Sequence, residues 1–104
     1  MAAATLRRYS GGIFAANTLT TVVPAIPAGR ALVIGKIIVA NVSGAQLTFG
    51  IAVGGVFVAS AISLAPSEVY TESGLVMVAG DNAQVTVTIA NGVVASFYGE
   101  EVDN

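Results

Sequence analysis

The residue types that most often perform catalysis are nearly absent from this sequence. It contains no His and no Cys, so neither a Ser-His-Asp nor a Cys-His site can be built from this chain alone. A pair of carboxylates could in principle hydrolyse a glycoside, but no aromatic-lined groove is expected beside them, and turn charges in solvent explain them better. We therefore expect no enzyme and no catalytic residue. The carboxylates are Glu68, Glu72, Asp81, Glu100, Glu101 and Asp103.

The turn at Gly80-Asp81-Asn82 is the best candidate for a metal site. Together with Glu68 or Glu72 it could offer oxygen ligands to Ca²⁺. Asp and Asn also favour turns without any metal, which accounts for the same residues. The segment GRALVIGK (29–36) lacks the Lys-Ser or Lys-Thr of a phosphate loop, and its apolar run is typical of a strand. The sequence therefore predicts no metal and no cofactor.

One basic and aromatic cluster, Arg7-Arg8-Tyr9, lies near the N-terminus. Two arginines make too few phosphate contacts for a nucleic-acid site. In an N-terminal arm the arginines could pair with carboxylates of another protein, Tyr9 could offer rigid contact area, and residues 10–12 could form a hinge. The alternative is a disordered terminus with incidental charges. With the two cations that bracket an apolar strand, the candidate partner-binding residues are Arg7, Arg8, Tyr9, Arg30 and Lys36.

The overall composition favours a small, strand-rich domain. Of the 104 residues, 55% are hydrophobic and only 10% are charged, where about 25% charged is usual. Val, Ile, Thr, Ala and Gly dominate, and these residues favour strands and tight turns over helices. The net charge of −2 is too small to indicate a nucleic-acid partner.

An uncharged stretch at residues 47–66 has the length of a membrane-spanning helix. Its apolar residues alternate with small or polar ones, which is the period of a strand, and Gly54-Gly55 is a hairpin signal. The helical alternative has glycines at four-residue spacing, Gly50 and Gly54, but the flanks lack the Lys and Arg residues that orient a membrane span. We expect a hairpin and no membrane contact.

The rest of the chain continues this pattern of short strands and turns. Residues 83–90 and 93–99 alternate in the same way on either side of Asn91-Gly92, which predicts a second hairpin. Turn signals recur every 8 to 12 residues and delimit seven to nine short strands. This spacing is typical of an all-β antiparallel β-sandwich of jelly-roll-like form. We expect an N-terminal arm at residues 1–17 and a β-sandwich domain at residues 18–104.

The predicted strand at residues 31–40 is apolar on both faces. Strict alternation places Leu32, Ile34 and Ile38 on one face, and residues 33, 37 and 39 on the other. An antiparallel sandwich normally exposes one face of each strand to water. The second face must therefore be covered by a local loop, by the arm or by another subunit. The scarcity of charges favours another subunit.

Two long stretches, 24–55 and 63–102, together resemble the small β-sandwich proteins of tailed bacteriophage virions. The matching turn positions are Asn41, Gly80-Asp81 and Gly99-Glu100. The resemblance implies a jelly roll or related sandwich in trimers or larger rings, which decorates capsids or occupies necks, tail fibres or baseplates. Such proteins are typically not enzymes.

From these observations we expect a capsid decoration or cement subunit at the virion surface. It would form a homotrimer and bind the major capsid protein or another virion protein. The alternatives are a phage neck, tail or fibre module, and a β-sandwich that binds carbohydrate or a host surface. A carbohydrate site would need exposed aromatic residues; Tyr70 and Tyr98 are candidates, whereas Phe49, Phe57 and Phe97 are expected in the core.

Overall fold

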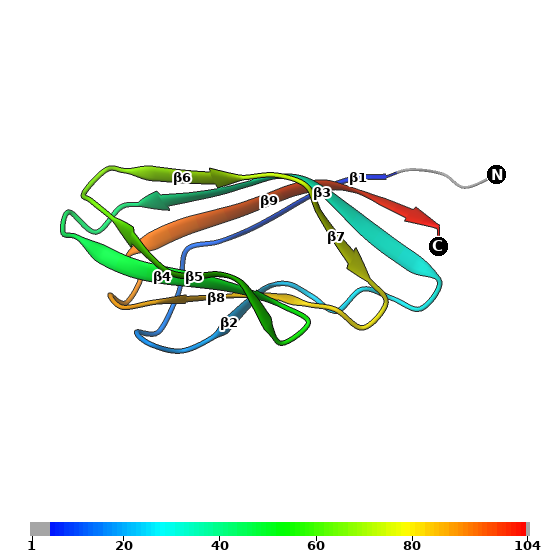
Figure 1. Cartoon of the computed structure of the whole chain (residues 1–104), viewed down its shortest axis with the longest axis horizontal. Coiled ribbons are helices and arrows are strands. Elements are labelled where there is room, and N and C mark those ends of the chain that lie inside the picture. The colour runs from blue at the N-terminus through cyan, green and yellow to red at the C-terminus, as the bar shows by residue number, and fades with distance from the viewer. Residues whose placement is uncertain (1–4, 104) are drawn as a thin grey trace.

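The chain folds as two antiparallel sheets packed face to face (Figure 1). A computed structural model describes residues 5–103, and no helix occurs among them. One sheet has five strands, with β1, β9, β3 and β6 in that order and β7 also pairing with β3; the other has the order β2-β8-β4-β5. The strands are β1 (Thr5–Gly11), β2 (Thr20–Val23), β3 (Arg30–Asn41), β4 (Leu47–Val53), β5 (Val56–Leu64), β6 (Val69–Glu72), β7 (Leu75–Val78), β8 (Ala83–Val87) and β9 (Val93–Asp103).

This strand order confirms the predicted all-β, jelly-roll-like antiparallel sandwich. The chain passes repeatedly from one sheet to the other, so strands that are adjacent in space are mostly distant in sequence. β9 pairs with β1 along one edge and with β3 along the other, which joins the two ends of the chain in one sheet. Such double-sheet topology is characteristic of jelly rolls.

The hairpin predicted at residues 47–66 is confirmed. β4 and β5 pair antiparallel, and Gly54 and Gly55 between them both have positive φ, at 58° and 81°. Glycine adopts positive φ at low cost because it has no Cβ, which explains why two glycines form this turn. The pairing contains two register shifts, and Ala61 in β5 has a φ of 53°.

The hairpin predicted across Asn91-Gly92 is wrong, although the two strands and the turn exist. β8 belongs to the four-stranded sheet and β9 to the five-stranded sheet, so the turn crosses between sheets. Tertiary hydrogen bonds hold this crossing: the Phe14 amide donates to the Asn91 side-chain oxygen, and the Asn91 amide donates to the Phe14 carbonyl. Local turn chemistry fixed the bend, while contacts with residue 14 fixed its direction.

Strict alternation along β3 is also wrong, because the strand contains a β-bulge. The pairing with β9 shifts register between Ile34 and Lys36. Ile37 and Val39 therefore lie on the same buried face as Leu32 and Ile34, and Val33 and Ile38 lie on the outer face. Both faces of β3 remain apolar, as predicted, with different members.

The core fills the space between the sheets. Its largest fully buried side chains include Phe14, Phe49 and Phe97, so the expectation for the last two is confirmed. Phe14 and β1 lie in the stretch predicted as an arm: residues 5–11 form an edge strand, and residues 1–4 lie outside the described part of the chain. The division of the chain at residue 17 stays a prediction. β9 extends through Asp103, so the polar end of the chain is part of the sheet.

Candidate assembly surface

The outer faces of the two sheets differ in chemistry. Strands β2, β4 and β8 of the four-stranded sheet present mainly hydroxyl and amide side chains, among them Thr21, Thr48, Gln84 and Thr86, whereas β5 exposes the apolar residues 56–58. On the five-stranded sheet the outward positions alternate with fully buried ones such as Leu32, Met77 and Phe97, and most of them are apolar. Its exposed large side chains are Leu6, Val33, Val69, Val76, Val78, Val94 and Tyr98.

These apolar side chains are highly exposed to solvent, and the chain has few charged residues to surround them. Leu6 is 79% exposed, Val76 56% and Val69 53%. They come from four strands, β1, β3, β6 and β7, and β9 adds Val94 and Tyr98 between them. Large exposed apolar patches are uncommon on monomeric proteins and frequent at interaction sites. We call this surface, defined by these seven residues, the outer apolar face.

A groove of about 670 Å³ crosses the outer apolar face. Its apolar lining includes Leu6 on β1, Val33 on β3 and Tyr98 on β9. Four charged residues also line it, and one of them, Arg7, forms an ion pair with Glu101. The full lining is Leu6, Arg7, Arg8, Val33, Gly35, Lys36, Tyr98, Gly99 and Glu100.

The strand register places these groove residues in two rows. In one row Arg8 on β1 and Lys36 on β3 are the neighbours of Tyr98 on β9, and the Arg8 guanidinium carbon lies 5.7 Å from the Tyr98 ring centroid. This is within range for a cation–π interaction. In the adjacent row Leu6 and Val33 are the neighbours of Glu100.

The charged side chains of residues 5–103 fall into two groups. Seven form a hydrogen bond or an ion pair within the chain. The other three, Arg8, Lys36 and Glu100, form neither, and all three line the groove on the outer apolar face. Charges that the fold itself leaves unpaired are therefore concentrated on its most apolar surface.

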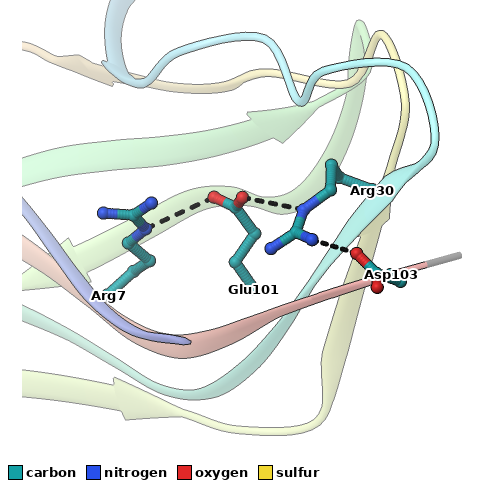
Figure 2. A network of polar contacts seen from close by, with 4 residues as sticks. All are labelled: Arg7, Arg30, Glu101 and Asp103. Atoms are coloured by element: carbon teal, nitrogen blue, oxygen red, sulfur yellow. Dashed lines mark hydrogen bonds and ion pairs between the residues drawn. The ribbon is translucent and has the colours of Figure 1, made fainter. Parts of the chain in front are cut away.

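An ion-pair network occupies the opposite side of the same strands (Figure 2). The two carboxylate oxygens of Glu101 accept hydrogen bonds from Arg7 Nε at 3.3 Å and from Arg30 Nε at 3.0 Å. Arg30 also pairs with Asp103. The Glu101 side chain is only 13% exposed, and the network joins β1, β3 and β9. Arg7 and Arg30 therefore have partners within the chain.

The five residues predicted to bind a partner thus divide between the two sides of the sheet. Arg8 and Lys36 point outward at the groove, whereas Arg7 and Arg30 lie in the network, and Tyr9 is partly buried against the core. Whether any of them contacts a partner stays a prediction. Sequence reasoning missed Glu100 and Tyr98 as their neighbours, because only the pairing of β9 with β1 and β3 brings these residues together.

A smaller groove of about 180 Å³ lies on the four-stranded sheet. Its lining includes Asn17, Thr48, Thr86 and Ser60, together with Phe57. The expectation that Phe57 lies in the core is wrong: it is 50% exposed, and its ring lies over Gly50, where a Cβ would approach the ring to 3.1 Å. The β4–β5 register shifts place Phe57 on this outer face.

The side chain of Tyr70, a candidate for carbohydrate contact, makes its contacts within the chain. Its hydroxyl donates to a Glu72 carboxylate oxygen, and its ring packs edge-on against Phe49 with centroids 5.2 Å apart. The hydrogen bond to Glu72 raises the pKa of Tyr70 to about 12, with smaller contributions from burial and from the Glu72 charge. Tyr98 is the more accessible of the two candidate tyrosines.

Within residues 5–103, no three His, Cys, Asp or Glu side chains come close enough to hold a metal ion. The Asp81 carboxylate instead accepts the Val78 amide at 3.1 Å and stabilises its own turn. No helix in this part of the chain is long and apolar enough to cross a membrane.

Comparisons with known proteins concern the fold. No protein-family model matches the chain, and no curated protein matches it either. Among solved structures, a chain from the disulfide-linked pili of Bacillus endospore appendages has a TM-score of 0.55 at 15% identity, covering 100% of this chain and 90% of that one.

Two carbohydrate-binding modules are also similar at a lower level. The module CBM36, solved with calcium and xylotriose, has a TM-score of 0.43 at 16% identity over 95% of this chain and 98% of its own. The module CBM35 from Paenibacillus barcinonensis has a TM-score of 0.37 at 15% identity over 95% and 89%. At 15% identity, the likeness to the pilus chain describes the fold alone.

Proposed function

We propose that this chain is a non-enzymatic structural subunit that assembles through the outer apolar face. The observation that carries the proposal is the exposure of Leu6, Val33, Val76 and their apolar neighbours across the strands of one sheet. On the other sheet the exposed large apolar side chains are confined to β5, at residues 56–58, and the remaining strands present Thr and Gln. Burying a Val or Leu side chain contributes roughly 1.5–3 kcal/mol. Several such residues per subunit give a strong drive toward association.

The finer proposal is a capsid decoration or cement subunit of a tailed phage, located at the virion surface. It is supported by the resemblance over residues 24–55 and 63–102 and by the jelly-roll topology. In this proposal the subunit contacts copies of itself, three in the arrangement that the resemblance implies, and the major capsid protein or another virion protein. Arg8 on the edge strand β1 is a candidate for the second contact.

Light scattering coupled to size exclusion tests the self-association. We expect the protein at tens of micromolar to elute with a mass above that of the 10.4 kDa chain. Val76→Thr should shift the equilibrium toward monomer by at least tenfold, since it introduces a hydroxyl into the outer apolar face. Val56→Thr is the matched control, because Val56 is also exposed, at 66%, but lies in the other sheet.

A monomeric wild-type protein at all accessible concentrations would contradict the proposal. Equal effects of the two substitutions would also contradict it, because the assembly would not depend on the outer apolar face. The capsid role has its own test, co-sedimentation with purified phage heads that lack the protein. There, Arg8→Ala should reduce binding if the edge strand β1 contributes to the contact.

A second candidate function, carbohydrate binding, is favoured by one observation. The groove on the four-stranded sheet joins a half-exposed ring, Phe57, with the hydroxyls of Thr48, Ser60 and Thr86. Neutral hydroxyls beside an aromatic ring can hold a sugar, since the ring contacts C–H groups and the hydroxyls bond in either direction. Binding to a glycan array that disappears in Phe57→Ala but persists in Tyr98→Ala would support this function.

A further inference from the structure

The unpaired charges on the outer apolar face have an arrangement that is complementary to itself. We infer that this face binds the same face of a second copy, and that Glu100 of each copy lies between Arg8 and Lys36 of the other. The inference rests on the proposed self-association and specifies its partner surface and its register. It replaces the three copies that the resemblance implies with a pair.

The inference starts from the two rows of the groove. Arg8, Tyr98 and Lys36 form one row across β1, β9 and β3, and Glu100 occupies the centre of the next row. Outward side chains two residues apart on a strand are about 6.8 Å apart, so the rows are direct neighbours. The positive row has two cations flanking the central strand, and the negative charge lies on that central strand.

Two copies can be related by a two-fold axis that lies in the interface, perpendicular to the strands and midway between the two rows. The row with Tyr98 in each copy then faces the row with Glu100 in the other. Glu100 of one copy then lies over Tyr98 of the second, with Arg8 on one side and Lys36 on the other. An axis along the central strand would instead place Glu100 over Glu100, which costs energy because like charges meet. The charges therefore select one of the two simple face-to-face arrangements, and in it every unpaired charge acquires an opposite neighbour.

The size of the face suits such a pairing. The five strands of this sheet have 7, 11, 12, 4 and 4 residues, and each residue covers about 16 Å², given a rise of about 3.3 Å and a strand spacing of about 4.8 Å. The face therefore covers about 600 Å², at the lower end of the range around roughly 800 Å² per partner that is standard for specific interfaces. Both sheet edges and the groove fall within this area.

The apolar residues and the charges have different tasks in this interface. Val76, Val78 and Leu6 supply the area that drives association. Ion pairs at an interface mainly set register and exclude wrong arrangements, because their attraction is offset by loss of hydration. The inference therefore predicts that charge reversal redirects pairing, which removal of an apolar contact cannot do.

Charge reversal and mixing give the decisive experiment. Glu100→Lys alone, and the double variant Arg8→Glu with Lys36→Glu, should each raise the dimer dissociation constant at least tenfold, since like charges then face each other. An equimolar mixture should restore a pair that contains one copy of each variant, measured by native mass spectrometry. The double variant Ser60→Lys with Ser63→Lys is the control, because it changes the net charge by the same two units as Glu100→Lys on exposed positions of β5.

Each outcome is interpretable against the proposed function. If association responds to Val76→Thr but to neither charge variant, the inference is overturned and the proposed function stands. A mixture that remains unpaired overturns it as well, and so does a wild-type mass of three copies. If the wild-type protein is monomeric, both the inference and the proposed function are contradicted. The side chains of Arg8, Lys36 and Glu100 are exposed, and circular dichroism with thermal melting checks that the variants keep the fold. Glu100→Gln provides a milder second variant, which is expected to weaken pairing without blocking it.

Discussion

Asn41 is the most fully hydrogen-bonded side chain of the interior. It is only 3% exposed, and its amide nitrogen donates to the carbonyls of Ala45, Leu64 and Ala65 at 2.7–3.1 Å. Its oxygen accepts bonds from the amide and the hydroxyl of Ser43. One side chain thus satisfies the backbone of two loops, the one after β3 and the one after β5.

Replacement of Asn41 by Ala should lower the free energy of unfolding by about 3 kcal/mol, because it removes three hydrogen bonds to carbonyls, the one to Leu64 buried and the other two partly buried, and two from Ser43. Chemical denaturation of the purified variant measures this loss. Gln46→Ala is the control, since Gln46 makes only one exposed hydrogen bond, at 3.4 Å, to Ser63. A loss below 1 kcal/mol for the Asn41 variant would show that water replaces its amide.

Tyr70 gives a pH dependence at the residue scale. Its pKa is raised from 10.0 to about 12 in the folded protein, mainly by the hydrogen bond to Glu72. A raised folded pKa contributes stability that is complete below pH 10 and is lost as pH rises from 10 through 12, because the unfolded state loses its proton first. The melting temperature should fall over this window, and Tyr70→Phe should show a smaller fall. The difference in phenolate absorbance between the two proteins should titrate near pH 12; a midpoint near 10 would contradict the hydrogen bond.

At the scale of strands, β1 depends on the ion-pair network for part of its attachment. It is an edge strand, mostly exposed, and Glu101 links it to β3 through Arg7 and Arg30. Glu101→Ala should speed amide hydrogen exchange in β1 several-fold and cost about 1 kcal/mol of stability, since it breaks an exposed pair with Arg7 and a partly buried pair with Arg30.

Asp103→Ala is the matched control for Glu101→Ala. Asp103 belongs to the same strand and the same network, but its side chain is 52% exposed and pairs with Arg30 alone. It should therefore leave exchange in β1 nearly unchanged. Equal exchange rates in both variants would mean that backbone pairing with β9 alone holds β1.

The strands also show which parts of the fold a sequence can reveal. The Gly54-Gly55 hairpin was predictable because both its signals, alternation and paired glycines, are local. The same local signals at Asn91-Gly92 predicted the wrong partner, because contacts with Phe14, 77 residues away, direct that turn. The bulge at Gly35 had no local signal beyond the glycine itself, and it changed the face of every later residue in β3.

The candidate site was predictable only in part for the same reason. Arg8 and Lys36 were identified from their residue types, and an uncovered apolar face was expected from β3. Their grouping with Glu100 and Tyr98 depends on cross-strand register between strands up to 90 residues apart. The second exposed ring, Phe57, was missed because register shifts in β5 reverse its direction.

On the scale of the whole molecule, the strands of the five-stranded sheet expose seven large apolar side chains and those of the four-stranded sheet expose three, all on β5. If it assembles as proposed, its melting temperature should depend on concentration, because mass action stabilises the assembled state. A hundredfold increase in concentration should raise the melting temperature by about 5 °C or more, given the sensitivity of domains of this size. Val76→Thr should reduce this dependence and Val56→Thr should not. A melting temperature independent of concentration in all three proteins would contradict assembly.

Three of the four sheet edges are irregular or short, whereas β1 pairs with β9 in continuous register over its seven residues. β5 carries two register shifts and Ala61 with positive φ, β2 has four residues followed by Pro24, and β6 and β7 have four residues each. Regular, unprotected edge strands in a chain this hydrophobic would favour open-ended strand addition and amyloid-like fibres. Short and irregular edges therefore disfavour strand addition at three of the four edges, and the proposed assembly proceeds through the outer apolar face instead.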